Sequence, residues 1–348
     1  MIILSIETSC DETAAAIVRV KGRRVEVLAD IVSSQIKMHS RYGGVVPQLA
    51  ARAHLRNMVP VLDKAFKKSG ISKNKIDYVA VTKGPGLIPA LMIGVNAARA
   101  LAFSLRKPLV EVNHLEGHIY ANWLDKEEAN SYKFKNMKFP VLCLIVSGGH
   151  TQLVLMKENM KFRIVGETVD DAVGEAFDKA AKILGLGYPG GPIIEKLARE
   201  GNADRIKFPR PMIGSGDLNF SFSGLKTAVL YETKEKDLSD GKYVADVAAS
   251  FQAAALEVLI SKTLKAAKKY EVRNVFLGGG VSANKALRKA LDDRFKKELP
   301  EVGVSFPPFK FTTDNAFMIA IAGYYRIREG KGITSYERIS PDMNLRLR

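Results

Sequence analysis

Two histidines four residues apart, His114 and His118, form the part of the sequence best suited to chemistry. On an α-helix they stand one turn apart on the same face, so both rings can reach a single metal ion. The chain has only 5 histidines in 348 residues, and such a pair is therefore uncommon by chance. The alternative is that both are ordinary helix histidines with surface or core contacts and no metal.

A third ligand has to come from elsewhere, because catalytic metals usually take three protein ligands and keep one position open. Asp314 is the best candidate, since it stands in a polar segment just before the apolar run 317–325. The alternative role is structural, because Thr313 or Asp314 is suited to cap the helix that follows. Two histidines and one carboxylate suit zinc and iron equally well, so the sequence predicts one divalent metal ion without choosing between them.

Glu116 argues against the His-Glu-x-x-His helix of metalloproteases. In those enzymes the glutamate directly follows the first histidine and acts as general base beside the metal. Here Glu116 comes two residues after His114, which turns it by about 200° round a helix and away from the histidine face. A peptidase built on these histidines would therefore lack its base.

The charge balance predicts a polyanionic partner. Lys and Arg number 53 against 37 acidic residues, a formal net charge of +16. Nucleic acid is the first candidate and a membrane surface the second, although a lysine-rich solvated surface with no such partner would give the same composition. The apolar N-terminal run is of strand length and lacks a basic leader, and the 2 cysteines are expected to be reduced and buried. We therefore expect a cytoplasmic protein that does not span a membrane.

Two kinds of element recur along the chain. Residues 1–18 are predicted as a β-hairpin with a polar turn at 7–13, and residues 141–156 repeat that plan with a turn at 147–151. A strand, a glycine-rich turn and a helix occur at 76–105 and again at 272–291. Glycine-rich turns before helices meet phosphates with backbone N–H groups, so the repeated plan indicates a nucleotide-binding α/β protein.

The duplicated plan resembles the superfamily of actin, sugar kinases and heat-shock chaperone ATPases. The resemblance implies a two-lobed α/β fold with a nucleotide cleft between the lobes. We expect an N-terminal lobe at 1–125, completed by a C-terminal helix at 313–330, and a C-terminal lobe at 139–312. The charged segment 126–138 is expected to be an exposed connection.

Ordered motifs along nearly the whole chain narrow this resemblance to one family. They are His-Leu-Glu-Gly-His at 114–118, Val-Ser-Gly-Gly-His-Thr at 146–151, Tyr-Gly-Gly-Val-Val-Pro at 42–47, Gly-Glu-Ala-Phe-Asp-Lys at 174–179, Tyr-Pro-Gly-Gly-Pro at 188–192, Ser-Phe-Ser-Gly-Leu-Lys at 221–226 and Gly-Gly-Gly-Val-Ser-Ala-Asn at 278–284. Together they resemble the TsaD family, the tRNA adenosine threonylcarbamoyltransferases formerly described as glycoprotein endopeptidases, in its bacterial form.

The resemblance implies an activity and a set of site residues. The family transfers the threonylcarbamoyl group of threonylcarbamoyl-AMP to N6 of adenosine 37 in tRNAs reading codons that begin with A. By the resemblance, the metal ligands fall on His114, His118 and Asp314, and an acidic position linked to activity falls on Asp11. The implied substrate-binding positions are Ile145, Val146, Ser147, Gly148, Gly149, Asp178, Gly191 and Asn284.

The resemblance also implies partners. The bacterial family works with a paralogous TsaB-like subunit and a TsaE-like small ATPase, in addition to tRNA. Two other classes remain as alternatives: an ATPase or sugar kinase of the same superfamily, and a metalloprotease. A kinase needs a catalytic aspartate facing a small sugar site and no metal held by histidines, whereas the transferase needs that metal.

Overall fold

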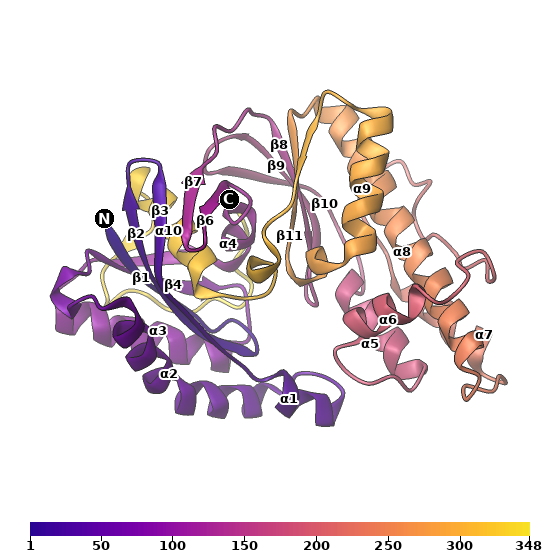
Figure 1. The fold of residues 1–348 in the computed structure, drawn as a ribbon, viewed down its shortest axis with the longest axis horizontal. Helices are drawn as coiled ribbons and strands as arrows, with labels where there is room; N and C mark the ends of the chain where they lie inside the picture. The colour runs from indigo at the N-terminus through magenta and orange to yellow at the C-terminus, as the bar shows by residue number, and fades with distance from the viewer. The chain divides into compact units, whose positions relative to one another are not determined.

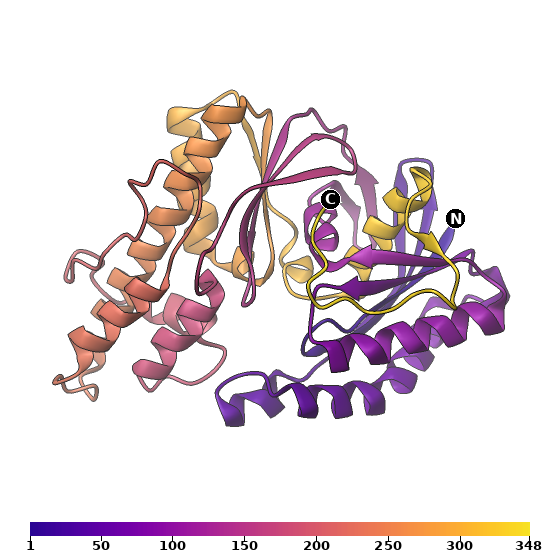
Figure 2. The same cartoon turned by 180° about the vertical axis from the view of Figure 1, so that it is seen from behind.

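A computed structural model describes all 348 residues and divides them into two compact units (Figures 1 and 2). The first unit contains Met1–Met137 and Pro307–Arg348, and the second contains Lys138–Phe306. The chain therefore leaves the first unit, builds the second and returns. Residues near the C-terminus share a core with residues near the N-terminus.

The first unit is built on an 8-stranded sheet in the order β13-β5-β4-β1-β2-β3-β7-β6. β1, β2 and β3 form an antiparallel meander, and β4 and β5 continue the sheet parallel to β1. The strands are β1 (Ile2–Glu7), β2 (Glu12–Lys21), β3 (Arg24–Ser34), β4 (Tyr78–Gly84), β5 (Leu109–Asn113), β6 (Leu124–Glu128), β7 (Ser131–Phe134) and β13 (Ile333–Thr334).

The second unit repeats the central part of that sheet. Its 5 strands have the order β10-β9-β8-β11-β12, which corresponds strand for strand to β3-β2-β1-β4-β5. The strands are β8 (Val141–Val146), β9 (Thr151–Glu158), β10 (Lys161–Glu167), β11 (Asn274–Gly278) and β12 (Gly303–Ser305). A meander followed by parallel strands thus occurs twice, and the predicted duplicated α/β fold is confirmed.

Helices cover both faces of the first sheet, because successive side chains along each strand point to opposite faces. Leu4 and Ile6 pack on the face that α2 and α3 cover, whereas the Ser5 hydroxyl on the other face donates a hydrogen bond of 2.6 Å to the Ala316 carbonyl of α10. Figures 1 and 2 show α2 and α3 side by side. The helices are α1 (Ile36–His39), α2 (Pro47–Ser69), α3 (Ile88–Leu105), α4 (His114–Tyr120), α5 (Val173–Ile183), α6 (Gly190–Ala198), α7 (Ser223–Thr233), α8 (Gly241–Tyr270), α9 (Lys285–Glu298) and α10 (Ala316–Arg328).

Residues 126–138 are not the exposed connection that their charge suggested. β6, which begins two residues before this segment, pairs with β7 as a hairpin, and β7 also pairs with β3. Tyr132 and Phe134 are buried, and the Phe134 ring stacks on Tyr324 of α10 at 4.9 Å. Lys133 between them is exposed, so charged and aromatic residues alternate with the period of a strand. The expectation of an exposed connection was based on the number of charged residues, which does not reveal this alternation.

Two helices, α3 and α8, are long and apolar enough by composition to cross a membrane. In α8 the apolar stretch is 83% buried, as expected for the core helix of the second unit. In α3 one face, which includes Leu91, Val95 and Ala98, packs on the first sheet. Length and composition are therefore weak grounds for a membrane span in either helix.

α4 and α10 pack closely against each other in the first unit. A Cβ atom on Gly117 of α4 would lie 2.9 Å from the Met318 side chain of α10, so only glycine allows this approach. On the same pair of helices, the Arg326 guanidinium donates two hydrogen bonds, of 2.6 and 2.7 Å, to the buried Glu116 carboxylate. This bidentate pair joins residues 210 positions apart in sequence.

Glu116→Gln is expected to destabilise the first unit by about 3 kcal/mol, because it leaves the Arg326 guanidinium without its counter-charge inside the protein. Urea unfolding in the presence of a chelator measures this without any contribution from bound metal. The double variant Glu116→Leu with Arg326→Met is the control, since it leaves no unpaired charge and should recover most of the loss. A wild-type unfolding midpoint for Glu116→Gln would contradict the assigned role of the pair.

Candidate metal centre

The two histidines lie at the start of α4, directly after β5. Asn113 caps the helix, because its side-chain oxygen accepts a hydrogen bond of 2.9 Å from the Leu115 N–H. The Asn113 amide also donates to the Leu345 carbonyl, so the C-terminal segment supports this cap. His114 is the first helical residue and His118 follows one turn later, with their ring centroids 4.7 Å apart.

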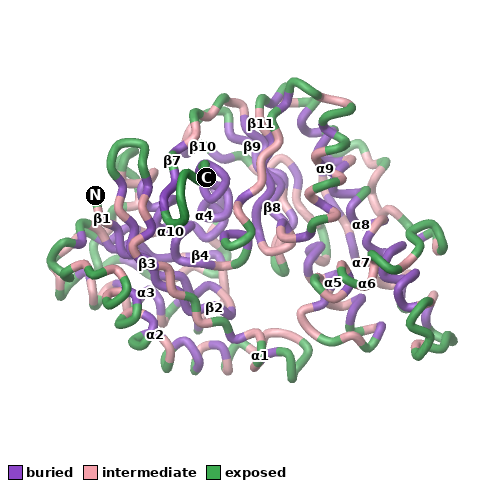
Figure 3. Tube along the Cα trace, viewed as in Figure 1, coloured by how far each residue is buried: buried purple, intermediate pink, exposed green.

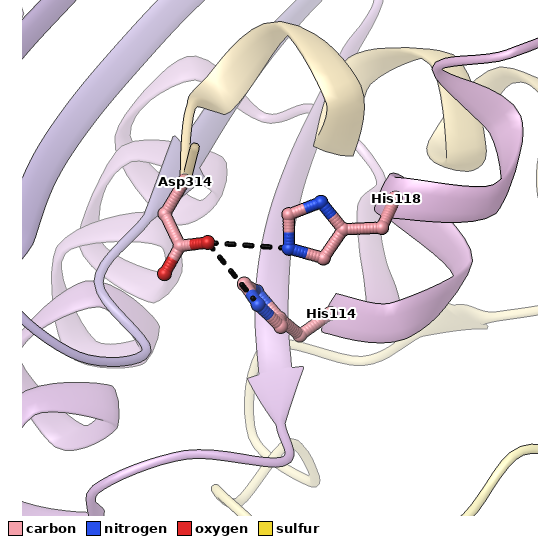
Figure 4. A group of neighbouring side chains, drawn as sticks. All are labelled: His114, His118 and Asp314. Carbon is pink, nitrogen blue, oxygen red and sulfur yellow. Dashed lines mark ion pairs between the residues drawn. The ribbon is translucent and has the colours of Figure 1, made fainter. Parts of the chain in front are cut away.

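Asp314 completes a three-residue cluster with these histidines (Figure 4). Its Oδ1 atom lies 3.4 Å from Nε2 of His114 and 3.2 Å from Nε2 of His118. The three potential ligand atoms lie within 4.8 Å of one another, and both histidines are buried. Two imidazole nitrogens and one carboxylate oxygen around a common point are a suitable ligand set for zinc or iron.

The hydrogen bonding of His118 supports the fit of a cation. Its side chain is almost fully buried, Nδ1 makes no hydrogen bond, and Nε2 has no well-aligned hydrogen bond although Oδ1 of Asp314 lies 3.2 Å away. A buried polar nitrogen without a partner is costly, and a metal ion at Nε2 would satisfy it. Metal binding by these three residues nevertheless stays a prediction.

Asp314 has no capping role in α10, contrary to the structural alternative drawn from the sequence. The cap is Asn315, whose side-chain oxygen accepts a hydrogen bond of 2.9 Å from the Met318 N–H. The sequence favoured Thr313 or Asp314 because both residue types cap helices well, and the helix begins later than that choice assumed. Asp314 can therefore be changed without removing the cap.

Glu7, at the end of β1, orients His114. This fully buried carboxylate lies 3.0 Å from Nδ1 of His114 and accepts hydrogen bonds from the Thr82 hydroxyl and the Ser9 N–H. A carboxylate on Nδ1 fixes that nitrogen as the donor and leaves Nε2 free for a metal. The sequence predicted no role for Glu7. Its position as an acidic residue at the end of an apolar strand is the signal that could have indicated one.

The two histidines differ in their protonation. Burial lowers the pKa of His114, but the charges of Asp314 and Glu7 and the hydrogen bond that His114 donates to Glu7 outweigh burial and raise that pKa to about 9. Burial dominates at His118 and lowers its pKa. Without a metal, His114 is therefore the protonated member of the pair at neutral pH.

The turn between β1 and β2 adds further acidic residues near the cluster. Burial, followed by the charges of Asp11 and Asp314, raises the pKa of Glu12 to about 10, so this side chain is protonated at neutral pH. Burial and the same acidic neighbours hold the pKa of the Cys10 thiol well above its usual value. Asp11 is 9% exposed and lies in this turn, in which the Ser9 hydroxyl lies 3.2 Å from Nδ1 of His114.

The predicted substrate-binding residues all belong to the second unit. Ile145 and Val146 are buried at the end of β8, and Ser147, Gly148 and Gly149 form the turn to β9. Gly148 and Gly149 are exposed, with open space where a Cβ would be. Such a turn can present its backbone N–H groups to a phosphate.

The glycine-rich turn after β11 lies against this first turn. Gly279 has a left-handed φ of 86°, and a Cβ there would lie 2.4 Å from the Val146 carbonyl oxygen. The start of α5 also meets the turn, because the Gly174 N–H donates to the Ser147 carbonyl at 3.2 Å. β8, β11 and α5 therefore converge on Ser147–Gly149.

The remaining three positions lie around the helices of the same unit. Asp178 of α5 accepts a hydrogen bond of 2.7 Å from the N–H of Gly190, the first residue of α6, so it holds the start of the helix in which Gly191 is the second residue. Asn284 caps α9 and donates a hydrogen bond of 2.8 Å to Gln252 of α8. Gln252 also lines a pocket of about 290 Å³ between α6, α8 and α9, whose charged lining is Glu195, Arg199, Lys285 and Lys289.

Metal binding is expected to tighten as the pH rises. Below its pKa of about 9, His114 carries a proton that a metal on Nε2 has to displace. The apparent dissociation constant should therefore fall about tenfold for each pH unit between the ordinary histidine pKa of 6.5 and about 9. Chelator competition across this range measures it, and calorimetry in buffers of different ionisation enthalpy should detect about one proton released per metal. A pH-independent dissociation constant would contradict this protonation state.

The chain is similar to known proteins over nearly its whole length. A family model described as TsaD, tRNA N6-adenosine threonylcarbamoyltransferase, matches residues 26–321. Three proteins with that name are similar to the chain. The one from Geobacillus kaustophilus is 52% identical over 94% of this chain and 92% of its own length. The one from Thermosipho africanus is 48% identical over 100% of both chains, and the one from Bacillus subtilis is 50% identical over 95% of this chain and 92% of its own.

The fold is also similar to that of a solved protein from outside the set of relatives with this name. HypF from T. kodakarensis matches 94% of this chain and 48% of its own, with a TM-score of 0.62 and 14% sequence identity. That likeness supports the duplicated α/β fold alone. Because the family model covers most of the residues and the relatives are about half identical over nearly their whole length, the chain belongs to the TsaD family of tRNA N6-adenosine threonylcarbamoyltransferases.

Proposed function

We propose that the chain transfers the threonylcarbamoyl group of threonylcarbamoyl-AMP to N6 of adenosine 37 in tRNAs that read codons beginning with A. The observation that carries this proposal is the convergence of His114, His118 and Asp314 in a chain of this family. We assign these side chains as ligands of one divalent metal ion, iron or zinc. When bound, such an ion polarises the carbonyl group that the adenosine nitrogen attacks.

The second unit is assigned the AMP portion of the donor. The exposed Gly148–Gly149 turn is open to a phosphate, which becomes the leaving group of the transfer. Asp178 and Gly191 are assigned to the ribose, and Asn284, beside the pocket that Gln252 lines, to the nucleoside. A charged and partly apolar pocket of this volume suits a nucleoside base.

We assign the threonylcarbamoyl end of the donor, where the transfer takes place, to the first unit. N6 of adenosine forms a bond to the carbamoyl carbon, the bond from that carbon to the AMP oxygen breaks, and N6 loses a proton. Glu7 keeps Nε2 of His114 available for the metal ion. Asp11 lies in the turn that borders the cluster, so we assign it as the acceptor of the proton that N6 loses. Adenine N6 is a weak nucleophile, so positioning by these groups has to supply much of the rate.

A metalloprotease is disfavoured by the position of the only glutamate on α4. The Glu116 carboxylate is buried in its bidentate pair with Arg326, so it cannot activate a water at the histidine cluster. The ATPase or sugar-kinase alternative has no comparable use for a buried cluster of two histidines and one aspartate.

We further propose that a paralogous TsaB-like subunit covers an apolar surface on α2 and α3, and that a TsaE-like small ATPase completes the system. Leu55 and Val59 of α2 are 66% and 72% exposed, and Met92 and Phe103 of α3 are 46% and 63% exposed. Adjacent helices that expose several large apolar side chains are typical of a protein interface.

Asp314→Asn is expected to lower metal affinity about tenfold or more, because an amide replaces the anionic ligand. Stability should stay close to wild type, since Asn315 caps α10. Metal analysis and nucleoside analysis of tRNA transcripts incubated with threonylcarbamoyl-AMP measure the two effects. Asp63→Asn, at an exposed position of α2, is the charge-matched control. Full metal occupancy with wild-type modification in Asp314→Asn would refute the metal assignment.

Leu55→Glu is expected to weaken association with the paralogous subunit about 30-fold or more, as expected for a charge placed in an apolar interface. Size-exclusion chromatography with light scattering on the mixed proteins measures association. Leu230→Glu, at a 50% exposed position of α7 in the second unit, is the matched control. The isolated chain should modify tRNA slowly, and rapid multiple turnover without partners would count against the proposed assembly.

A further inference from the structure

The basic residues of this protein differ in whether an acidic side chain pairs with them. Residues 31–62 contain no Asp or Glu, and their four basic side chains form no ion pair: Lys37, Arg41, Arg52 and Arg56. α9 carries a comparable number of basic residues, but there Lys289 pairs with Asp293 and Lys296 with Asp292. The uncompensated positive charge of residues 31–62 is therefore available to an external anion.

Residues 36–46 within this stretch, called here the 36–46 segment, combine two of these cations with an exposed aromatic ring. Lys37 and Arg41 are exposed, and Tyr42 is 60% exposed. Figure 3 shows exposed and intermediate stretches of the tube around α1. A tyrosine ring that is left open to solvent beside unpaired cations has no role in the packing of the first unit. The same combination is typical of surfaces that stack on nucleic-acid bases.

A buried histidine holds the 36–46 segment in a defined conformation. His39 is fully buried, with Nε2 lying 3.2 Å from the Gln35 side-chain oxygen and Nδ1 accepting a hydrogen bond from the Val46 N–H. Gln35 in turn donates to the Ala50 carbonyl of α2. Both ends of the segment are thus tied to one another and to α2, so its exposed side chains are presented by an ordered loop.

The segment also rests on the turn that borders the metal cluster. The Gln35 N–H donates to the Asp11 carbonyl at 2.9 Å, and the Ser34 hydroxyl donates to the Glu12 carboxyl at 3.1 Å. Ser9, in the same turn, has its hydroxyl 3.2 Å from Nδ1 of His114. Hydrogen bonds from residues 34 and 35 to residues 11 and 12, the short backbone of the turn, and the contact of Ser9 with His114 therefore connect the base of the 36–46 segment to the histidine cluster within the first unit.

We propose that the 36–46 segment binds the single-stranded RNA next to the adenosine that is modified. Lys37 and Arg41 pair with backbone phosphates, and the Tyr42 ring stacks on a base. This inference rests on the proposed function, because a tRNA has to be the substrate. Single-stranded RNA is bound by stacking on aromatic side chains within a positive surface, which is the combination that this segment offers.

The double variant Lys37→Glu with Arg41→Glu tests the phosphate contacts. Binding of a fluorescently labelled, unmodified tRNA transcript is measured by anisotropy with the full chain over a range of salt concentrations. We expect affinity to fall about tenfold or more, and the slope of log affinity against log salt to decrease by about 1.4, since each phosphate contact to a single strand contributes about 0.7. Lys64→Glu with Lys68→Glu is the control.

The control makes the same change of net charge at another place in the first unit. Lys64 and Lys68 are exposed and form no ion pair, and Lys64 lies about 25 Å along α2 from its first residue at 1.5 Å per residue. An equal loss of tRNA affinity in both double variants would mean that only net charge matters, and would overturn the assignment of the segment. Wild-type affinity in Lys37→Glu with Arg41→Glu would overturn it as well.

Tyr42 tests the stacking contact without any change of charge. Tyr42→Ala is expected to lower tRNA affinity about tenfold, whereas Tyr42→Phe keeps a ring and should bind as the wild type does. Equal binding by Tyr42→Ala and the wild type would overturn the stacking role. If these variants bind tRNA normally but lose association with a protein subunit, the segment is a protein interface and the RNA assignment is wrong.

The outcomes separate this inference from the proposed function. A wild-type chain that binds no tRNA, alone or with its subunits, would refute the proposed function itself. A wild-type chain that binds tRNA while the segment variants bind equally well would refute only the inference. Metal content of each variant is measured in parallel and should match the wild type, since no residue of the segment belongs to the ligand cluster.

Discussion

The packing of α10 against α4 is the constraint on which the candidate metal centre depends. Asp314 precedes α10 by one capping residue, and the two histidines begin α4, so the ligand cluster exists only while these helices stay in register. The buried pair of Glu116 and Arg326 fixes that register with two directed hydrogen bonds, and Gly117 removes the side chain that would keep the helices apart. The geometry of the candidate ligand cluster thus depends on a contact that lies outside it.

The cluster is electrostatically incomplete without a cation. Glu7 and Asp314 hold a proton on His114, while burial keeps His118 neutral and its ring nitrogens lack well-aligned hydrogen bonds. Glu12 stays protonated because more negative charge beside Asp11 and Asp314 would be too costly in a buried site. A divalent ion would replace the His114 proton and satisfy His118, so folding has prepared a site whose charge and geometry favour metal binding.

The duplicated fold gives two units whose central strands have the same order but whose equivalent turns carry different side chains. In the second unit the turn after the first strand of the repeat is rich in glycine and open, which suits a phosphate. In the first unit the corresponding turn is acidic, and it borders a histidine cluster that the second unit does not have. The same topology therefore carries an open glycine turn in one repeat and a histidine–aspartate cluster in the other, because the side chains at equivalent turns differ.

The sequence by itself determined the features that depend on neighbours along the chain. The i, i+4 histidines lie on one helix face, Glu116 points away from it, and both hairpins and both glycine-rich turns form, because helix and strand periods are local properties. Only the tertiary structure decided that Asn315 caps α10, that charged residues 126–138 add two strands to the first sheet, and that Glu7 orients His114. Each of these depends on groups brought together from distant parts of the chain, and burial and hydrogen bonding between such groups leave no periodic signal in the sequence.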